Sequence, residues 1–167
     1  MKEPLIRSLL AHPMDGAAIE TRSLELIDRE APPHDFAPGA WTVVRRMIHA
    51  SADFSLAGST LFSPDAIPAA IAALRGGKPI YVDSGMIRAG LSLARLRAAC
   101  PDYCAERLHC HIADPDVARE ATASKLPRSL FAVRKARMVL DGGIAVFGNA
   151  PVALLELNRM IIEEQLR

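Results

Sequence analysis

Apolar residues recur every three or four positions through the first half of the chain, which is the spacing of helices that bury one face. This spacing predicts three helices, within residues 15–30, 41–54 and 63–77. Pro32 and Pro33 follow the first helix and end it, because proline removes a backbone hydrogen bond. In the third stretch, the sequence gives clear signals for both ends of the helix.

Ser63 is expected to cap the third helix and Pro64 to be its first helical residue. Gly76 and Gly77 are expected to end it.

Three short apolar runs follow in the second half, at residues 79–83, 108–113 and 143–148. They lack a clean alternation of apolar and polar positions, as strands covered on both faces do. Helical segments separate them, so we expect right-handed crossovers and a parallel sheet. The predicted fold is α/β, in a single domain over residues 1–167, with ligands expected beyond the carboxyl ends of the strands.

The second helix carries a histidine outside its apolar side. On a helical wheel the apolar residues form one broad arc, made of Trp41, Val43, Val44, Met47, Ile48, Ala50, Ala52 and Phe54. His49 lies opposite, with Arg45 and Asp53 four residues away in either direction and Arg46 beside it. The pattern predicts that His49 points away from the core of its own helix, a position typical of a surface histidine.

A basic segment precedes the third apolar run. Pro127 is expected to start a helix there, which places Arg128 and Ser129 in its first turn. The helix dipole does not favour a cation at that end, so Arg128 is expected either to lie in solvent or to contact something other than its own helix. A last helix is expected to begin at Pro151.

Composition excludes several classes of function. The chain has 167 residues with 20 Lys and Arg against 19 Asp and Glu, so charge gives no reason to expect nucleic acid or an anionic membrane surface as a partner. No apolar run approaches the roughly 18 residues of a membrane span. The N-terminal residues lack the long apolar region of a secretory signal, and we expect a cytoplasmic protein.

Three cysteines argue against a disulfide framework. A metal site could combine Cys100, Cys104 and Cys110 with His109 or His111, but the spacing matches neither CxxC nor a zinc knuckle. A buried strand with Cys110 on one face and both histidines on the other is the favoured interpretation, and we predict no metal site.

A nucleotide-binding domain is poorly supported by the sequence. Neither GxGxxG nor GxxxxGK[ST] occurs, and "GGKP" precedes an expected strand instead of lying between a strand and a helix.

Four segments together resemble the precorrin-8X methylmutase family of cobalamin biosynthesis, also called cobalt-precorrin-8 methylmutases. They are "IETRSLELI", "RRMIHASADF", "LFSPDAIPAAIAALRGGKPIYVDSGMIRAG" and "PRSLFAVRKARMVLDGGIAVFGNAP". Their order and spacing carry the resemblance, which runs from about residue 15 to the end of the chain.

The resemblance implies a three-layer α/β/α, flavodoxin-like fold and a homodimer. It implies an isomerase that moves a methyl group from C-11 to C-12 of a modified tetrapyrrole, with no metal or organic cofactor. It also implies a catalytic histidine within "RMIHA", which is His49, acting as proton donor. The residues implied to hold the substrate are Arg22, Ser23, Ser92, Arg128 and, with a weaker match, Ser129.

The chain departs from the family after its last predicted helix. The family pattern continues through two more strands, so the resemblance implies a sheet that lacks the family's last two strands and leaves residues 143–148 as an apolar edge. Two hypotheses follow. The chain is the isomerase, or it is a non-catalytic tetrapyrrole-binding module or a partial subunit that a second chain completes.

Overall fold

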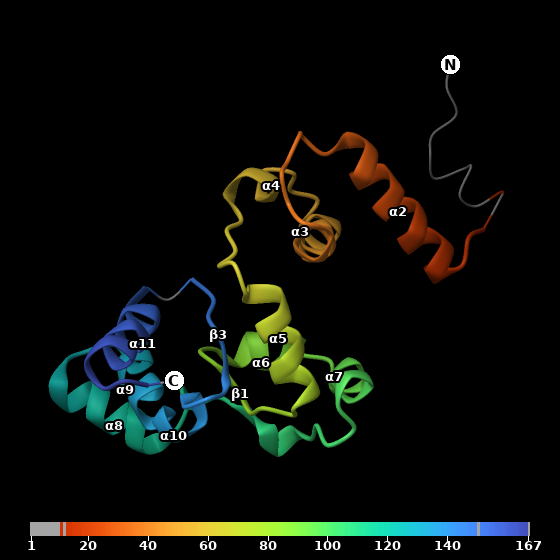
Figure 1. The fold of residues 1–167 in the computed structure, drawn as a ribbon. Coiled ribbons are helices and arrows are strands. Elements are labelled where there is room, and N and C mark those ends of the chain that lie inside the picture. Colours follow the sequence, from red (N-terminus) through yellow and green to blue (C-terminus); the bar gives the residue numbers. More distant parts are fainter. Residues whose placement is uncertain (1–10, 12, 150, 167) are drawn as a thin grey trace. The chain divides into compact units, whose positions relative to one another are not determined.

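Figure 1 shows the fold in a computed structural model that describes residue 11, residues 13–149 and residues 151–166. The chain divides into two compact units, Met1–Ile67 and Pro68–Arg167. A single domain over the whole chain stays a prediction.

Between residues 13 and 59, the first unit contains two helices and a short third one. Helix α2 (Gly16–Glu30) begins where Asp15 caps it, with the Asp15 carboxylate accepting the N–H of Ala18 at 2.7 Å. Helices α3 (Pro38–Ser51) and α4 (Leu56–Ser59) follow. The first two predicted helices are confirmed, because both apolar stripes find a partner in this unit.

The core of the first unit lies between α2, α3 and α4. Its buried residues are Ile27, Val44, Ile48 and Ala57. Half-buried aromatic side chains pack around them, among them Trp41 of α3 and, from the connecting segments, Phe36 and Phe62. The core is small, so each helix buries only a narrow stripe.

Helix α5 (Ala66–Arg75) begins two residues later than the sequence predicts. The Ser63 carbonyl accepts the N–H of Ala66 at 3.0 Å, so Ser63 and Pro64 belong to a turn before the helix. The predicted end is confirmed, since α5 stops before Gly76 and Gly77, and Gly77 has φ +61°, which favours glycine.

Alternating strands and helices make up the rest of the second unit. In chain order they are β1 (Ile80–Val82), α6 (Gly85–Gly90), α7 (Leu93–Ala99), the 3₁₀ turn η1 (Ala105–Arg107), β2 (Leu108–His109), α8 (Pro115–Ser124), α9 (Arg128–Lys135), α10 (Arg137–Leu140), β3 (Ile144–Val146) and α11 (Pro151–Glu163).

The three strands form a parallel sheet in the order β2-β1-β3, which confirms the predicted α/β fold. These are the first three positions of the flavodoxin-like order 2-1-3-4-5. All three strands are shorter than the apolar runs that predicted them, because only two or three residues of each find a ladder partner. Strand β3 is an edge of the sheet within the described residues, and its Ala145 is exposed.

Helices cover both faces of β1, which makes three layers. Tyr81 points to one face and packs in a cluster with residues of α9, α10 and α11, such as Val133 and Met160. Ile80 and Val82 point to the other face and pack with residues of α5, α6 and α7. All three β1 side chains are buried, as expected for the central strand of a parallel sheet.

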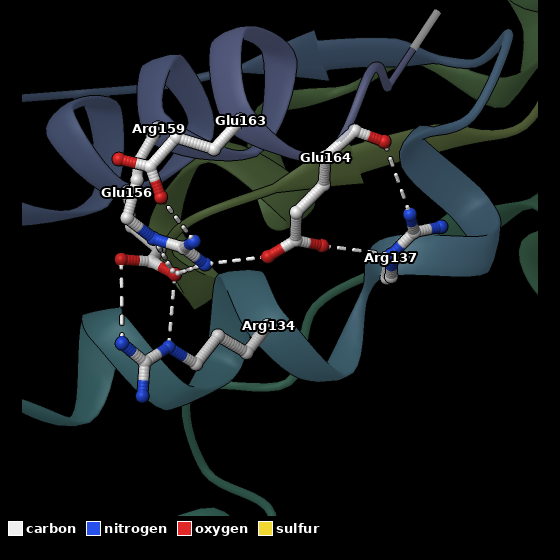
Figure 2. A network of polar contacts seen from close by, with 6 residues as sticks. All are labelled: Arg134, Arg137, Glu156, Arg159, Glu163 and Glu164. Atoms are coloured by element: carbon white, nitrogen blue, oxygen red, sulfur yellow. Dashed lines mark hydrogen bonds and ion pairs between the residues drawn. The ribbon is translucent and has the colours of Figure 1, made fainter.

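A network of arginine and glutamate side chains joins the last helices of the second unit (Figure 2). Glu156 of α11 is only 5% exposed and accepts hydrogen bonds from Arg134 Nε at 2.8 Å and Arg159 Nη2 at 2.7 Å. Glu164 links Arg159 to Arg137 at 2.7 and 3.0 Å. The network links α11 and the residue after it to α9 and α10. These three helices cover the face of the sheet to which Tyr81 points.

Candidate functional site

His49 lies in the last turn of α3 and is half-buried. The predicted broad apolar arc of this helix is wrong in part, because Val43 and Met47 are about two-fifths exposed, at 40% and 38%. The buried stripe is narrower and contains Val44 and Ile48. Helix α2 packs beside that stripe on the side of His49, which hydropathy alone does not reveal.

The side chain of His49 forms a hydrogen bond with Ser23 of α2. The distance between Ser23 Oγ and His49 Nδ1 is 2.8 Å. A neutral imidazole accepts the hydroxyl proton at Nδ1 and carries its own proton on Nε2, whereas a protonated imidazole donates from Nδ1 to Oγ. In either state the bond fixes the ring, and no described residue hydrogen-bonds Nε2.

Ion pairs on both sides of this contact hold α3 against α2. Arg45 donates to Asp28 at 2.6 Å, and the same carboxylate accepts from the indole N–H of Trp41 at 2.9 Å. Arg46 pairs with Glu20. The two arginines expected beside His49 are therefore directed to carboxylates of α2.

Asp53 does not continue the helix that carries His49, although the sequence places it four residues on. Helix α3 ends at Ser51, and Ala52 takes a left-handed conformation with φ 56°. The Asp53 carboxylate instead accepts the N–H of Ser55 at 2.9 Å, and its hydrogen bonds with Ser55 hold its pKa below the usual value. Asp53 thus stabilises the turn into α4.

A small pocket of about 200 Å³ opens beside the Ser23–His49 pair. Its lining residues all belong to the first unit and are Ser23, Leu26, Ile27, Glu30, Ile48, His49, Ala52 and Phe54. Arg22 lies outside this lining, exposed on α2 with Glu25 at 3.3 Å.

The other predicted substrate-binding residues belong to the second unit. Ser92 is exposed and caps α7, where its hydroxyl accepts the N–H of Arg95 at 3.4 Å. Arg128 lies in the first turn of α9, as predicted, although the helix begins at Arg128 itself and not at Pro127. Arg128 is exposed and has no hydrogen bond or ion pair to any described residue. Ser129, next to it, is half-buried.

Sequence reasoning missed Asp83, a buried carboxylate at the carboxyl end of β1. Asp83 is 5% exposed, and both of its oxygens lie 3.1 Å from the N–H of Gly148, in the loop after β3. The available signal was an acidic residue directly after a buried strand, in "IYVDSG". Asp83 joins the loop after β1 to the loop after β3, at the carboxyl ends of the strands, where parallel folds bind ligands.

In the segment from Cys100 to His111, two cysteines pack in an apolar cluster and one histidine forms an ion pair. Cys100 is buried, and Cys110 packs against the same apolar cluster. Burial lowers the pKa of His109, with the neighbouring His111 adding to the effect, and His111 pairs with Asp114 at 2.9 Å. No group of three or more His, Cys, Asp or Glu within the described residues could hold a metal ion.

The described helices include none that combines the length and the apolar character needed to cross a membrane.

Comparison with known proteins identifies the relatives of this chain. The model of the precorrin-8X methylmutase family matches residues 18–167. The cobalt-precorrin-8 methylmutase of Leptospira interrogans is 41% identical over 155 residues, which are 91% of this chain and 68% of that relative. The one of Priestia megaterium is 41% identical over 149 residues, covering 89% of this chain and 64% of the relative.

Solved structures give the same result. The precorrin-8X methylmutase of Thermus thermophilus has a TM-score of 0.77 and 42% identity, over 87% of this chain and 68% of that protein. This chain thus spans about two thirds of the length of the relatives that it matches.

Proposed function

The chain belongs to the precorrin-8X methylmutase family, a family of isomerases, and we propose that it moves a methyl group from C-11 to C-12 of precorrin-8X or its cobalt-containing form. The observation that carries the proposal is the family match over residues 18–167. Relatives named as methylmutases favour this activity over a non-catalytic tetrapyrrole-binding module.

His49 is the proposed proton donor. A methyl shift within one molecule needs no nucleophile, but it is helped by an acid that stabilises the rearranged ring. Histidine suits this role because its ordinary pKa is about 6.5. The hydrogen bond between Ser23 and Nδ1 supports the proposal, because it leaves Nε2 to give the proton to the macrocycle and to regain one from solvent.

In this proposal Ser23 acts mainly through His49. Arg22, Ser92, Arg128 and Ser129 are proposed to hold the peripheral carboxylates of the tetrapyrrole. Arginine suits carboxylates because its planar donors can form two parallel hydrogen bonds. The exposure of Arg128 and its lack of a described ion-pair partner support this role, and the exposed Arg22–Glu25 pair is weak enough to be exchanged for a substrate carboxylate.

The proposal includes a homodimer in the cytoplasm. Size-exclusion chromatography with light scattering tests the dimer, and a monomer at micromolar concentration would contradict it.

The experiment that tests the function mixes the purified chain with precorrin-8X and follows its visible absorption spectrum. We expect conversion by the native chain and none by His49→Ala, with the tetrapyrrole still bound. His34→Ala is the matched control, because His34 stacks on Trp41 in the same unit and lies outside the pocket lining. Equal rates for His49→Ala and the native chain would refute the role of His49.

A further inference from the structure

The pocket beside His49 is too small for a whole tetrapyrrole. Its volume is about 200 Å³, whereas pockets that enclose drug-sized molecules measure roughly 300–1,000 Å³. A tetrapyrrole that contacts His49 must therefore lie across the mouth, with one edge of the ring inside the pocket.

The lining of this pocket is mostly apolar, and its polar side chains are those of Ser23, His49 and Glu30. Helix α2 contributes Ser23, Leu26, Ile27 and Glu30, which are spaced three or four residues apart and so share one face of the helix. The opposite wall comes from the end of α3 and the residues after it, among them Ile48 and Phe54. Such walls suit methyl groups and not the charged ends of acetate or propionate side chains.

The lining of the pocket carries negative charge. Glu30 is the acidic residue of the lining, and its exposed partner Arg29 is not part of the lining. Helix α2 ends at Glu30, and α3 ends at Ser51, directly before the lining residue Ala52. The carboxyl ends of both helices add partial negative charge here.

We propose that this pocket receives an uncharged, methyl-bearing edge of the tetrapyrrole and that Glu30 keeps the substrate's carboxylates out of it. The inference rests on the proposed function. Without Glu30, a peripheral carboxylate could enter the pocket and pair with the protonated imidazole of His49. Such a pair would hold the proton away from the ring and bind the macrocycle in an unproductive orientation. Glu30 is therefore a residue that determines orientation.

Charge reversal at position 30 tests the proposal. For Glu30→Lys we expect precorrin-8X to bind as tightly as to the native chain or more tightly, while the single-turnover rate falls about tenfold. Sodium propionate serves as a carboxylate probe, and it should inhibit Glu30→Lys at concentrations that leave the native chain unaffected. Glu30→Gln should also lower the single-turnover rate and increase inhibition by propionate, but by less. It replaces Glu30→Lys if that variant does not fold.

The matched control is Glu120→Lys, an identical change at an exposed position of α8 that lies outside the pocket lining. Equal turnover and equal propionate inhibition in the Glu30 and Glu120 variants would overturn the proposal. If the native chain binds precorrin-8X without converting it, the proposed function fails, and propionate competition for binding still decides the role of Glu30. If the native chain does not bind precorrin-8X, both are overturned.

Discussion

Replacing Glu156 with glutamine should loosen the attachment of α11 to the second unit. The carboxylate is 5% exposed and accepts hydrogen bonds from Arg134 and Arg159, so the variant leaves two guanidinium groups facing a neutral amide (Figure 2). Removing one partner of a fully buried ion pair costs about 3–5 kcal/mol. Both arginines keep partial contact with solvent, at 46% and 35%, so we expect a loss of about 2–3 kcal/mol.

Urea denaturation followed by far-ultraviolet circular dichroism measures this loss. With a denaturant slope of about 2–3 kcal/mol per molar, the midpoint should fall by roughly 1 M. Glu163→Gln is the control on the same helix, because Glu163 is 61% exposed and its bond to Arg159 should contribute about 0.5 kcal/mol or less. Equal midpoints for the two variants would refute the importance of the buried carboxylate.

The effect of pH on the free energy of unfolding tests the role of Glu156 independently. Hydrogen bonds from Arg159 and Arg134 lower the pKa of Glu156 in the folded chain, against about 4.3 in the unfolded chain. Its contribution is therefore fully present above about pH 5 and is lost as the pH falls through the lower folded value. The difference in unfolding free energy between the native chain and Glu156→Gln should shrink below about pH 4. A difference that grows on acidification would contradict this sign.

Three further changes have separate expected results. Ser23→Ala should lower kcat about tenfold or more with little change in KM, because His49 loses the bond that orients it, and an unchanged kcat in steady-state kinetics would refute that role. Asp83→Ala should cost about 1–3 kcal/mol by leaving the N–H of Gly148 without its acceptor, and calorimetry should show Tm lowered by about 3–10 °C. Arg128→Ala should raise KM for precorrin-8X without a change in Tm, whereas an unchanged KM would exclude contact with substrate.

Much of the fold could be predicted from local pattern. Proline follows the end of α2, and two glycines follow the end of α5, so both helices end where the sequence places their ends. Strand lengths could not be predicted in this way. The run at residues 108–113 is six residues long, yet only Leu108 and His109 find partners on β1. Pairing depends on a neighbour that is distant in sequence.

The candidate site was less accessible to sequence reasoning. Periodicity places His49 outside the apolar arc but does not show that α2 packs on that side. The contact between Ser23 and His49 spans 26 residues of sequence, and the contact between Asp83 and Gly148 spans 65. Such contacts depend on how helices and strands pack together, which the spacing of residue types along the chain does not encode.

The most direct test of the central claim follows the migrating carbon itself. Precorrin-8X that carries ¹³C in the methyl group on C-11 is incubated with the purified chain, and the labelled methyl is observed by NMR. The account predicts that the signal moves to the position of a methyl group on C-12 with the native chain and stays on C-11 with His49→Ala. A labelled methyl that stays on C-11 with the native chain, under conditions where the tetrapyrrole is bound, would contradict it.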